Sequence, residues 1–193
     1  MDIMNDKYKL TLASGSPRRR QLMADAGFVF EVEPSKSDDE SYPGDMPHYE
    51  IPQYLSLRKS LTFHRELSAD EILITADTLV FLDSEVLGKP SDRDDAFRIL
   101  RSLSGRVHQV LTGVTLRSLS KTVSFTDTSD VEFCPLSDSD IAYYVDACRP
   151  FDKAGAYGIQ DWIGLTHISS IHGSYFNVMG LPVHRLWQEL SRW

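Results

Sequence analysis

The chain has few cysteines and no long apolar run. Its 193 residues include only two cysteines, Cys134 and Cys148, which lie in no CxxC pattern of the kind used by redox or zinc sites. No run of 18 apolar residues is present, which argues against a transmembrane helix. The first ten residues also lack the apolar core of a secretory leader. We therefore expect a cytoplasmic protein with reduced thiols and no membrane association.

Positive charge is also scarce. The chain has 20 Lys and Arg against 28 Asp and Glu, a net charge of −8. Binding to a nucleic-acid backbone relies on extended basic surface, so we expect no nucleic-acid partner. The exception is a run of three arginines at 18–20. A local basic cluster in an acidic chain suits a small, highly charged anion better than a long polyanion.

Several common catalytic motifs are missing. The sequence contains no GxxxxGK[ST] loop, no strand-linked GxGxxG and no GxSxG elbow, which argues against P-loop NTPases, Rossmann-type dinucleotide binding and serine hydrolases. His167, His172 and His184 do not have the spacings of zinc sites. The composition, 41% hydrophobic and 25% charged, is that of an ordinary globular protein.

The most informative stretch that is present is LTLASGSPRRR, at 10–20. It predicts a strand, a tight loop and a helix with Pro17 at its first position and Ser16 as its cap. The arginines then lie in the first turn, where the helix dipole disfavours each cation by about 0.3–1 kcal/mol. An anion held by the free backbone N–H groups would explain them. Four residues are candidates for binding it: Ser14, Ser16, Arg18 and Arg19.

Asp77 lies in the apolar segment ILITADTLVF. A carboxylate at the end of a buried strand is costly unless it is paired, hydrogen-bonded or bound to metal, and strand ends are where ligands bind in open α/β sheets. The alternative is a structural aspartate that caps a turn through its own backbone. The segment alone does not choose between these interpretations.

Two lysines are candidates for neutralising phosphate charge. Lys89 extends from the rigid turn LGKP, and Lys59 lies within a predicted helix. A lysine ammonium acts on phosphate as a compact point charge. For each lysine taken alone, a solvated surface position is the simpler interpretation.

Two loops could complete a nucleotide site. The acidic run at 38–40 suggests Mg²⁺ or Mn²⁺, hard ions that take oxygen ligands, although such a run can equally be an exposed charged loop. In AGAYGIQ, Gly155 and Gly158 allow close backbone approach to a ligand, and Gln160 offers the donor and the acceptor that suit a base edge. By itself, the second segment could be only a tight corner.

Residue periodicity predicts a mixed α/β sheet, because strands and helices do not alternate strictly. The helix at 48–67 is expected to place Tyr54, Leu55, Leu61 and Phe63 in the core. Strands are expected at 8–13, 28–32, 72–76, 85–87, 108–116 and 122–133, with an extended segment at 78–82 after the central one. Helices are expected at 18–26, 48–67, 92–103 and 137–148, with a last helix opened by Gly180-Leu181-Pro182.

Five motifs occur in order along the chain: LASGSPRRRQL, ITADTLV, LGKP followed by LSGRVHQVLTGV, DKAGAYGIQ, and GSYFNVMGLP. With them the chain closely resembles the Maf family of nucleotide pyrophosphatases. The resemblance implies one domain over residues 1–193, with an elongated mixed β-sheet flanked by helices, two lobes and a central cleft. This fold is similar to that of inosine triphosphate pyrophosphatases. The resemblance also implies a homodimer.

The resemblance further implies an activity, the hydrolysis of nucleoside triphosphates to the monophosphate and pyrophosphate with Mg²⁺ or Mn²⁺. Asp77 matches the family's proton acceptor, and Arg18, Thr78 and Gln160 match the positions that mark substrate choice. The combination of ADT and GIQ resembles the branch that acts on dTTP and UTP rather than on 7-methyl-GTP. The alternative is a nucleotide-binding regulator of septum formation.

For this reaction we expect three catalytic residues, Asp77, Lys59 and Lys89, and a metal held by Asp39 and Asp77. The family loop often ends in Asp-Glu, and direct alignment places Asp39 where that glutamate falls. Glu40 follows immediately and could replace it. Because successive helix residues diverge by about 100°, the arginines cannot all face one phosphate. Arg20 is expected to make a structural or surface contact.

Overall fold

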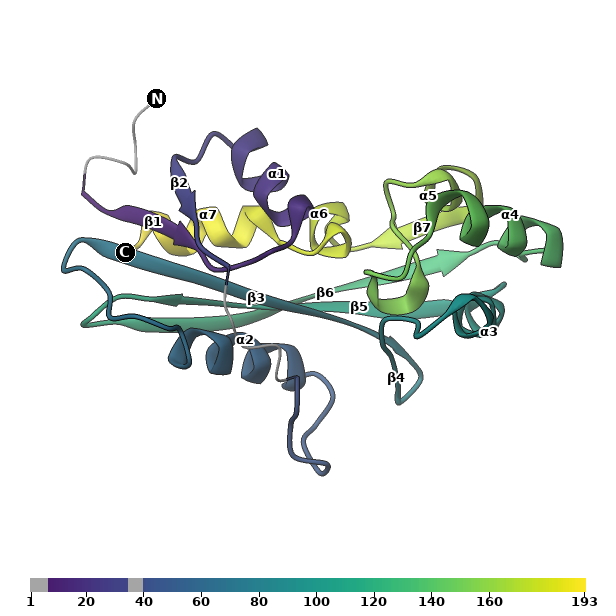
Figure 1. The fold of residues 1–193 in the computed structure, drawn as a ribbon, viewed down its shortest axis with the longest axis horizontal. Coiled ribbons are helices and arrows are strands. Elements are labelled where there is room, and N and C mark those ends of the chain that lie inside the picture. The colour runs from purple at the N-terminus through teal and green to yellow at the C-terminus, as the bar shows by residue number, and fades with distance from the viewer. Residues whose placement is uncertain (1–6, 35–39) are drawn as a thin grey trace. The chain divides into compact units, whose positions relative to one another are not determined.

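The computed structural model of the chain describes residues 7–34 and 40–193 (Figure 1). In this part, seven strands form one sheet in the order β2-β1-β3-β5-β6-β7, with β4 paired to β3. β1 runs parallel to β2 and β3, whereas β4 and β7 run antiparallel to β3 and β6. The predicted mixed α/β sheet is therefore confirmed. The strands are β1 (Lys9–Leu12), β2 (Phe30–Val32), β3 (Glu71–Leu82), β4 (Glu85–Leu87), β5 (Val107–Arg117), β6 (Thr122–Phe133) and β7 (Ile168–His172).

Some of the helices begin at residues whose side chains cap them. Ser16, Asp92 and Ser137 each accept a backbone N–H at the start of a helix, which satisfies a donor that would otherwise have no partner. No helix within 7–34 or 40–193 is long and apolar enough to span a membrane. The helices are α1 (Pro17–Asp25), α2 (Ile51–Leu61), α3 (Arg93–Leu103), α4 (Asp138–Cys148), α5 (Trp162–His167), α6 (Tyr175–Met179) and α7 (Val183–Ser191), with a 3₁₀ turn at Ala154–Ala156.

The chain folds into two compact units. The first contains the chain up to Asp77 together with Thr112–Asp127 and Gly180–Trp193, and the second contains Thr78–Leu111 and Thr128–Met179. The long strands β3, β5 and β6 contribute residues to both units. The single domain over residues 1–193 stays a prediction.

In the first unit, α1 and α7 lie on one face of the sheet and α2 lies on the other (Figure 1). Glycine allows α2 to approach the sheet closely, since a Cβ atom on Gly113 of β5 would lie 2.1 Å from the backbone of Pro52. The buried residues of α2, among them Leu55 and Ser56, fall on this side. Leu55 and Phe63 are buried as predicted, and Tyr54 is half-buried.

The sequence prediction for α2 was wrong in two respects. The helix ends at Leu61 rather than at Leu67, and Leu61 is 64% exposed instead of part of the core. A position six residues after Leu55 is rotated by about 240° around a helix, so Leu61 points away from the buried face. Phe63 still reaches the core, but from the loop after the helix.

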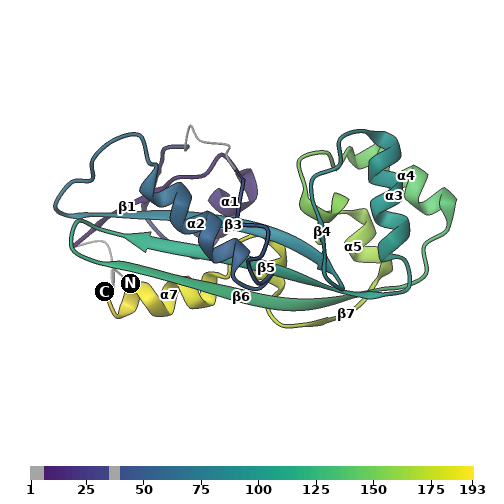
Figure 2. The same ribbon diagram turned by 90° about the horizontal axis from the view of Figure 1, so that it is seen from below.

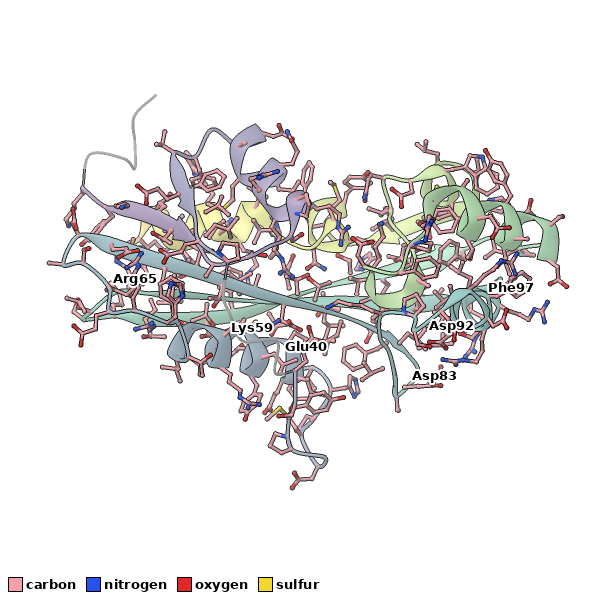
Figure 3. The ribbon with its side chains drawn as sticks, viewed as in Figure 1. Glu40, Lys59, Arg65, Asp83, Asp92 and Phe97 are labelled. Carbon is pink, nitrogen blue, oxygen red and sulfur yellow. The ribbon has the colours of Figure 1, made fainter. Side chains whose placement is uncertain are left out.

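A partly buried ion cluster fixes the start of β3. The Glu71 side chain is 1% exposed and accepts hydrogen bonds from the Arg65 guanidinium, labelled in Figure 3, and from the Thr11 hydroxyl. Arg65 also binds Glu33 at 2.7 Å. The Arg65 hydrogen bonds lower the pKa of Glu71 to about 2, so the carboxylate stays charged. The strand that carries Asp77 is thereby anchored at its first residue.

In the second unit, α3, α4 and α5 pack side by side (Figure 2). Their buried faces share one apolar core with β5 and β6, and Leu100, Tyr144 and Ile163 are fully buried in it. The elements α5, β7 and α6 were not predicted from the sequence. Each is only five or six residues long, which is too short for periodicity to distinguish it from a loop.

His108 lies in this core, and its burial leads to a prediction of how the stability of the protein depends on pH. Its Nε2 is 2.7 Å from the Tyr157 hydroxyl, and burial lowers the pKa of His108 to about 4. The unfolded chain binds a proton near pH 6.5, before the folded protein does. The free energy of unfolding should therefore be unaffected by His108 above pH 6.5 and should fall from there toward pH 4, by about 2 kcal/mol between pH 7 and pH 4.5.

The measurement is urea unfolding at the two pH values for the wild type and for His108→Gln. Glutamine has no proton to gain in this range, but it retains a polar group that can reach Tyr157. The wild type should lose about 2 kcal/mol more than the variant. Equal losses in the two proteins would show that His108 does not cause the fall in stability at low pH.

Candidate active site

The loop before α1 is held by its own serine side chains. The Ser14 hydroxyl is buried and accepts the Ser16 backbone N–H at 3.2 Å. The Ser16 hydroxyl accepts the Arg19 backbone N–H at 3.4 Å, and Pro17 is the first residue of the helix. The cap and the proline position predicted from the sequence are confirmed. The first turn of α1 contains no acidic residue to offset its arginines.

The three arginines have different environments. Arg20 is exposed, whereas Arg18 and Arg19 are half-buried. Arg19 donates from Nε to the Gly180 carbonyl at 2.8 Å and from Nη1 to the Ser14 hydroxyl at 3.3 Å. Burial lowers the pKa of Arg19, while the charges of Asp77 and Glu40 oppose this shift. Arg19 is thus held at the loop by Ser14 and Gly180, with its charge near enough to the two carboxylates to interact with them.

Asp77 forms an ion pair with Lys59. The Lys59 ammonium donates to Oδ1 of Asp77, and their side chains are 16% and 6% exposed. Asp77 is not at the end of its strand as expected, because β3 continues to Leu82. An interpretation of Asp77 as a turn cap is therefore wrong. Lys59, for which a solvated surface position was the simpler interpretation, instead compensates the buried charge of Asp77.

A second carboxylate lies near the same ammonium. Oε1 of Glu40 is 3.8 Å from Nζ of Lys59, and Figure 3 labels both residues. Asp39, the expected metal ligand, lies outside the described residues. Over 7–34 and 40–193, no group of three or more potential ligands gathers. Asp77 and Glu40 both lie at the Lys59 ammonium, and such a pair of oxygen donors fits Mg²⁺ or Mn²⁺ when phosphate oxygens complete the shell.

The other predicted site residues belong to the second unit. Thr78 is half-buried in β3, and Lys89 is exposed after β4. The loop of Lys89 is joined to the glycine-rich loop, since the Gly155 N–H donates to the Gly88 carbonyl at 3.1 Å. Gln160 is half-buried, and its Oε1 is enclosed with no hydrogen-bond partner among the residues that the structure describes.

Each unit thus contains part of the predicted set. In the first unit, the charge of Asp77 acts on Arg19, and Lys59 joins Asp77 to Glu40. Sequence reasoning missed the Gly180 carbonyl as the acceptor for Arg19. The motif GSYFNVMGLP contains this glycine, but a backbone carbonyl leaves no signal in residue type. The first unit holds Ser14, Ser16, Arg18, Arg19, Lys59 and Asp77, and the second holds Thr78, Lys89 and Gln160.

The family model described as Maf-like protein matches residues 9–193. The chain belongs to the Maf family. Among curated Maf relatives, the dTTP/UTP pyrophosphatase of Bacteroides thetaiotaomicron is 51% identical over 187 residues, which cover 97% of each chain. That of Parabacteroides distasonis is 48% identical over 185 residues, 96% of each chain. The Maf resemblance predicted from the five motifs is confirmed.

A solved structure with a different name is also similar. The nucleoside-triphosphatase, or dITP/XTP pyrophosphatase, of Mycobacterium abscessus aligns over 95% of each chain, with 11% identity and a TM-score of 0.46. A likeness of this size supports no argument about the Maf chain's substrate.

Proposed function

We propose that this chain hydrolyses nucleoside triphosphates, with dTTP and UTP as its main substrates, to the nucleoside monophosphate and pyrophosphate. The observation that carries the proposal is the buried Asp77 carboxylate, paired with Lys59 in the unit that holds the arginine-rich start of α1. A buried charge of this kind is costly to maintain, and such groups concentrate at functional sites. The relatives named dTTP/UTP pyrophosphatase support the choice of substrate.

The start of α1 is the proposed triphosphate site. Its first turn offers backbone N–H groups and the positive end of the helix dipole, which together attract phosphate. Arg18 and Arg19 add charge, and Arg19 is held at Ser14 and Gly180 by its hydrogen bonds. An arginine held before the substrate arrives loses less conformational freedom on binding than a free one does. Lys89 neutralises charge on the leaving pyrophosphate.

Asp77 is the proposed general base. It accepts a proton from the water whose oxygen attacks the α-phosphorus, while the bond from that phosphorus to the bridging oxygen breaks and the electron pair leaves with pyrophosphate. Lys59 holds the carboxylate in place and offsets its charge. In this proposal, the main role of Lys59 is to hold the base, and neutralising phosphate charge is secondary.

A divalent cation completes the proposal. Asp77 and Glu40 are the described residues that would hold it, and Asp39 stays a predicted ligand. When bound, Mg²⁺ or Mn²⁺ withdraws charge from the phosphate oxygens. Glu40 and Asp77 both approach the Lys59 ammonium, so two carboxylates share one ammonium and this group has a net negative charge that a cation would offset.

Substrate choice is assigned to Thr78 and Gln160, with Arg18. The amide of Gln160 can both donate and accept, and uracil and thymine present the same hydrogen-bonding edge. One residue can therefore accept both bases. The Oε1 of Gln160 has no partner among the described residues, and an acceptor left in this state costs roughly 1–3 kcal/mol. A base that offers a donor would remove this cost once the amide turns toward it.

The decisive experiment incubates the purified protein with dTTP and Mg²⁺ or Mn²⁺ in H₂¹⁸O. The expected products are dTMP and pyrophosphate, with the ¹⁸O in dTMP because water attacks the α-phosphorus. Products of dTDP and orthophosphate would identify a stepwise phosphatase instead. Binding without turnover would favour the regulator of septum formation.

Two further controls test the substrate and the cation. In a panel of nucleotides, dTTP and UTP should have the highest kcat/KM, and a preference for 7-methyl-GTP would overturn the assignment of the branch. Exhaustive EDTA treatment should abolish turnover, and Mg²⁺ or Mn²⁺ should restore it. Activity that survives chelation would remove the cation from the proposal.

A further inference from the structure

The residue assigned to base recognition, Gln160, lies on a tight turn. The Asp161 backbone N–H donates to the Gly158 carbonyl at 3.0 Å, which closes residues 158–161 with Gln160 in the third position. A turn of four residues is held weakly by one backbone hydrogen bond. Additional contacts are needed if the Gln160 side chain is to keep a single orientation.

The Tyr144 hydroxyl provides a second closure. Tyr144 projects from α4, is fully buried, and accepts the Gly158 N–H at 2.9 Å. It also donates to Oδ2 of Asp161 at 2.8 Å. One hydroxyl therefore binds the first and the last residue of the turn. Burial raises the pKa of Tyr144, and Asp161 raises it further, so the hydroxyl keeps the proton that it donates.

Gly158 makes the arrangement sterically possible. A Cβ atom at this position would lie 2.5 Å from Oδ2 of Asp161 and 3.0 Å from Nε2 of Gln160. The carboxylate and the amide thus both fold over a residue that has no side chain. Nζ of Lys153 is 3.9 Å from the same carboxylate oxygen and partly offsets its charge.

We propose that Tyr144 and Asp161 are positioning residues for Gln160, and that their hydrogen bonds across the 158–161 turn set pyrimidine selectivity. This inference rests on the proposed function. Its physical basis is that the enclosed Oε1 of Gln160 has no partner in the described part of the chain. The ring N–H of a base would supply the missing hydrogen bond once the amide turns toward it, and the direction of the amide depends on the turn that carries it. A displacement of 1 Å would lose that bond.

A simpler account is that Tyr144 only fills the core and satisfies its hydroxyl locally. Both accounts predict some loss of stability when the hydroxyl is removed. They differ in what happens to base recognition. A core residue would affect all substrates equally, whereas a positioning residue would affect only substrates that carry a base.

The test compares Tyr144→Phe with the wild type on dTTP and on 2-deoxyribose 5-triphosphate, which lacks the base. For dTTP, kcat/KM should fall about 10-fold, mainly through KM, because one hydrogen bond's worth of orientation is lost. For the base-free substrate, kcat/KM should stay within about 2-fold. Tyr143→Phe is the matched control, since Tyr143 lies beside it on α4 and is 56% exposed; neither substrate should respond to it.

Asp161 gives an independent pair of variants should Tyr144→Phe fold poorly. Asp161→Ala removes the acceptor and should reduce kcat/KM for dTTP alone, whereas Asp161→Asn keeps an acceptor oxygen and should largely restore it. Equal losses on both substrates, or an unchanged ratio, would overturn the inference and leave the proposed function intact. A wild type that does not hydrolyse dTTP would instead overturn the proposed function, and the inference with it.

Discussion

Asp77→Asn is expected to reduce kcat for dTTP hydrolysis by about 10²–10⁴-fold, the range associated with loss of a general base. The amide has nearly the same shape as the carboxylate but cannot accept the proton of the attacking water. The phosphate-binding residues proposed at the start of α1 are untouched, so any rise in KM should come only from a weaker hold on the cation that Asp77 is proposed to share. Pyrophosphate release under saturating dTTP measures the effect.

The matched control is Asp70→Asn. Asp70 is exposed and immediately precedes β3, so the same chemical change is made in the same segment without touching Lys59. Its kcat should equal that of the wild type. Thermal melts should show that Asp77→Asn remains folded. If it turns over dTTP at a rate close to the wild type, another residue must be the base.

The start of α1 shows what a sequence can reveal about a site. The cap at Ser16 and the proline at the first position are local features, set by residues within one turn of the helix. For the same reason the end of α3 near Ser104-Gly105 could be predicted. The largely apolar stretch of β3 was equally clear, since a central strand is buried on both faces.

The partners of the site residues could not be predicted in this way. Lys59 and Asp77 are 18 positions apart, and Arg19 and the Gly180 carbonyl are 161 apart. Neither pair leaves a pattern in spacing, because only the sheet and the packing of α2 and α7 bring their elements together. The sequence left open whether Asp77 caps a turn, and the position of Asp77 inside β3 decides that question.

Some expectations depend on more than one chain or on a segment beyond the described residues. The homodimer and the cytoplasmic location stay predictions, as does the role of Asp39. For the metal ligand, the sequence left Asp39 and the next residue, Glu40, as alternatives. The Glu40 carboxylate is 3.8 Å from the Lys59 ammonium. An alignment offset of one position is enough to exchange the two carboxylates.

Lys59→Met is expected to impair both folding and catalysis. It removes the ammonium but keeps a flexible chain of similar length, and so leaves the Asp77 carboxylate, 6% exposed, without its partner. Removing one member of a buried pair typically costs about 3–5 kcal/mol. Catalysis should also fall, with kcat/KM for dTTP reduced about 10²-fold, because a fixed positive charge that holds the base is lost. Urea unfolding and steady-state kinetics measure the two effects.

Lys9→Met separates this effect from the mere loss of a lysine. Lys9 binds Glu31 at 2.9 Å, but their side chains are 45% and 64% exposed, and such surface pairs contribute about 0–1 kcal/mol. The double variant Lys59→Met with Asp77→Asn should recover much of the stability, because the neutral amide no longer needs a cation. It should not recover the activity, because the base is gone. If the stability loss of the double variant equals the sum of the losses of the two single variants, Lys59 and Asp77 do not interact. That result would contradict the role assigned to the buried ion pair.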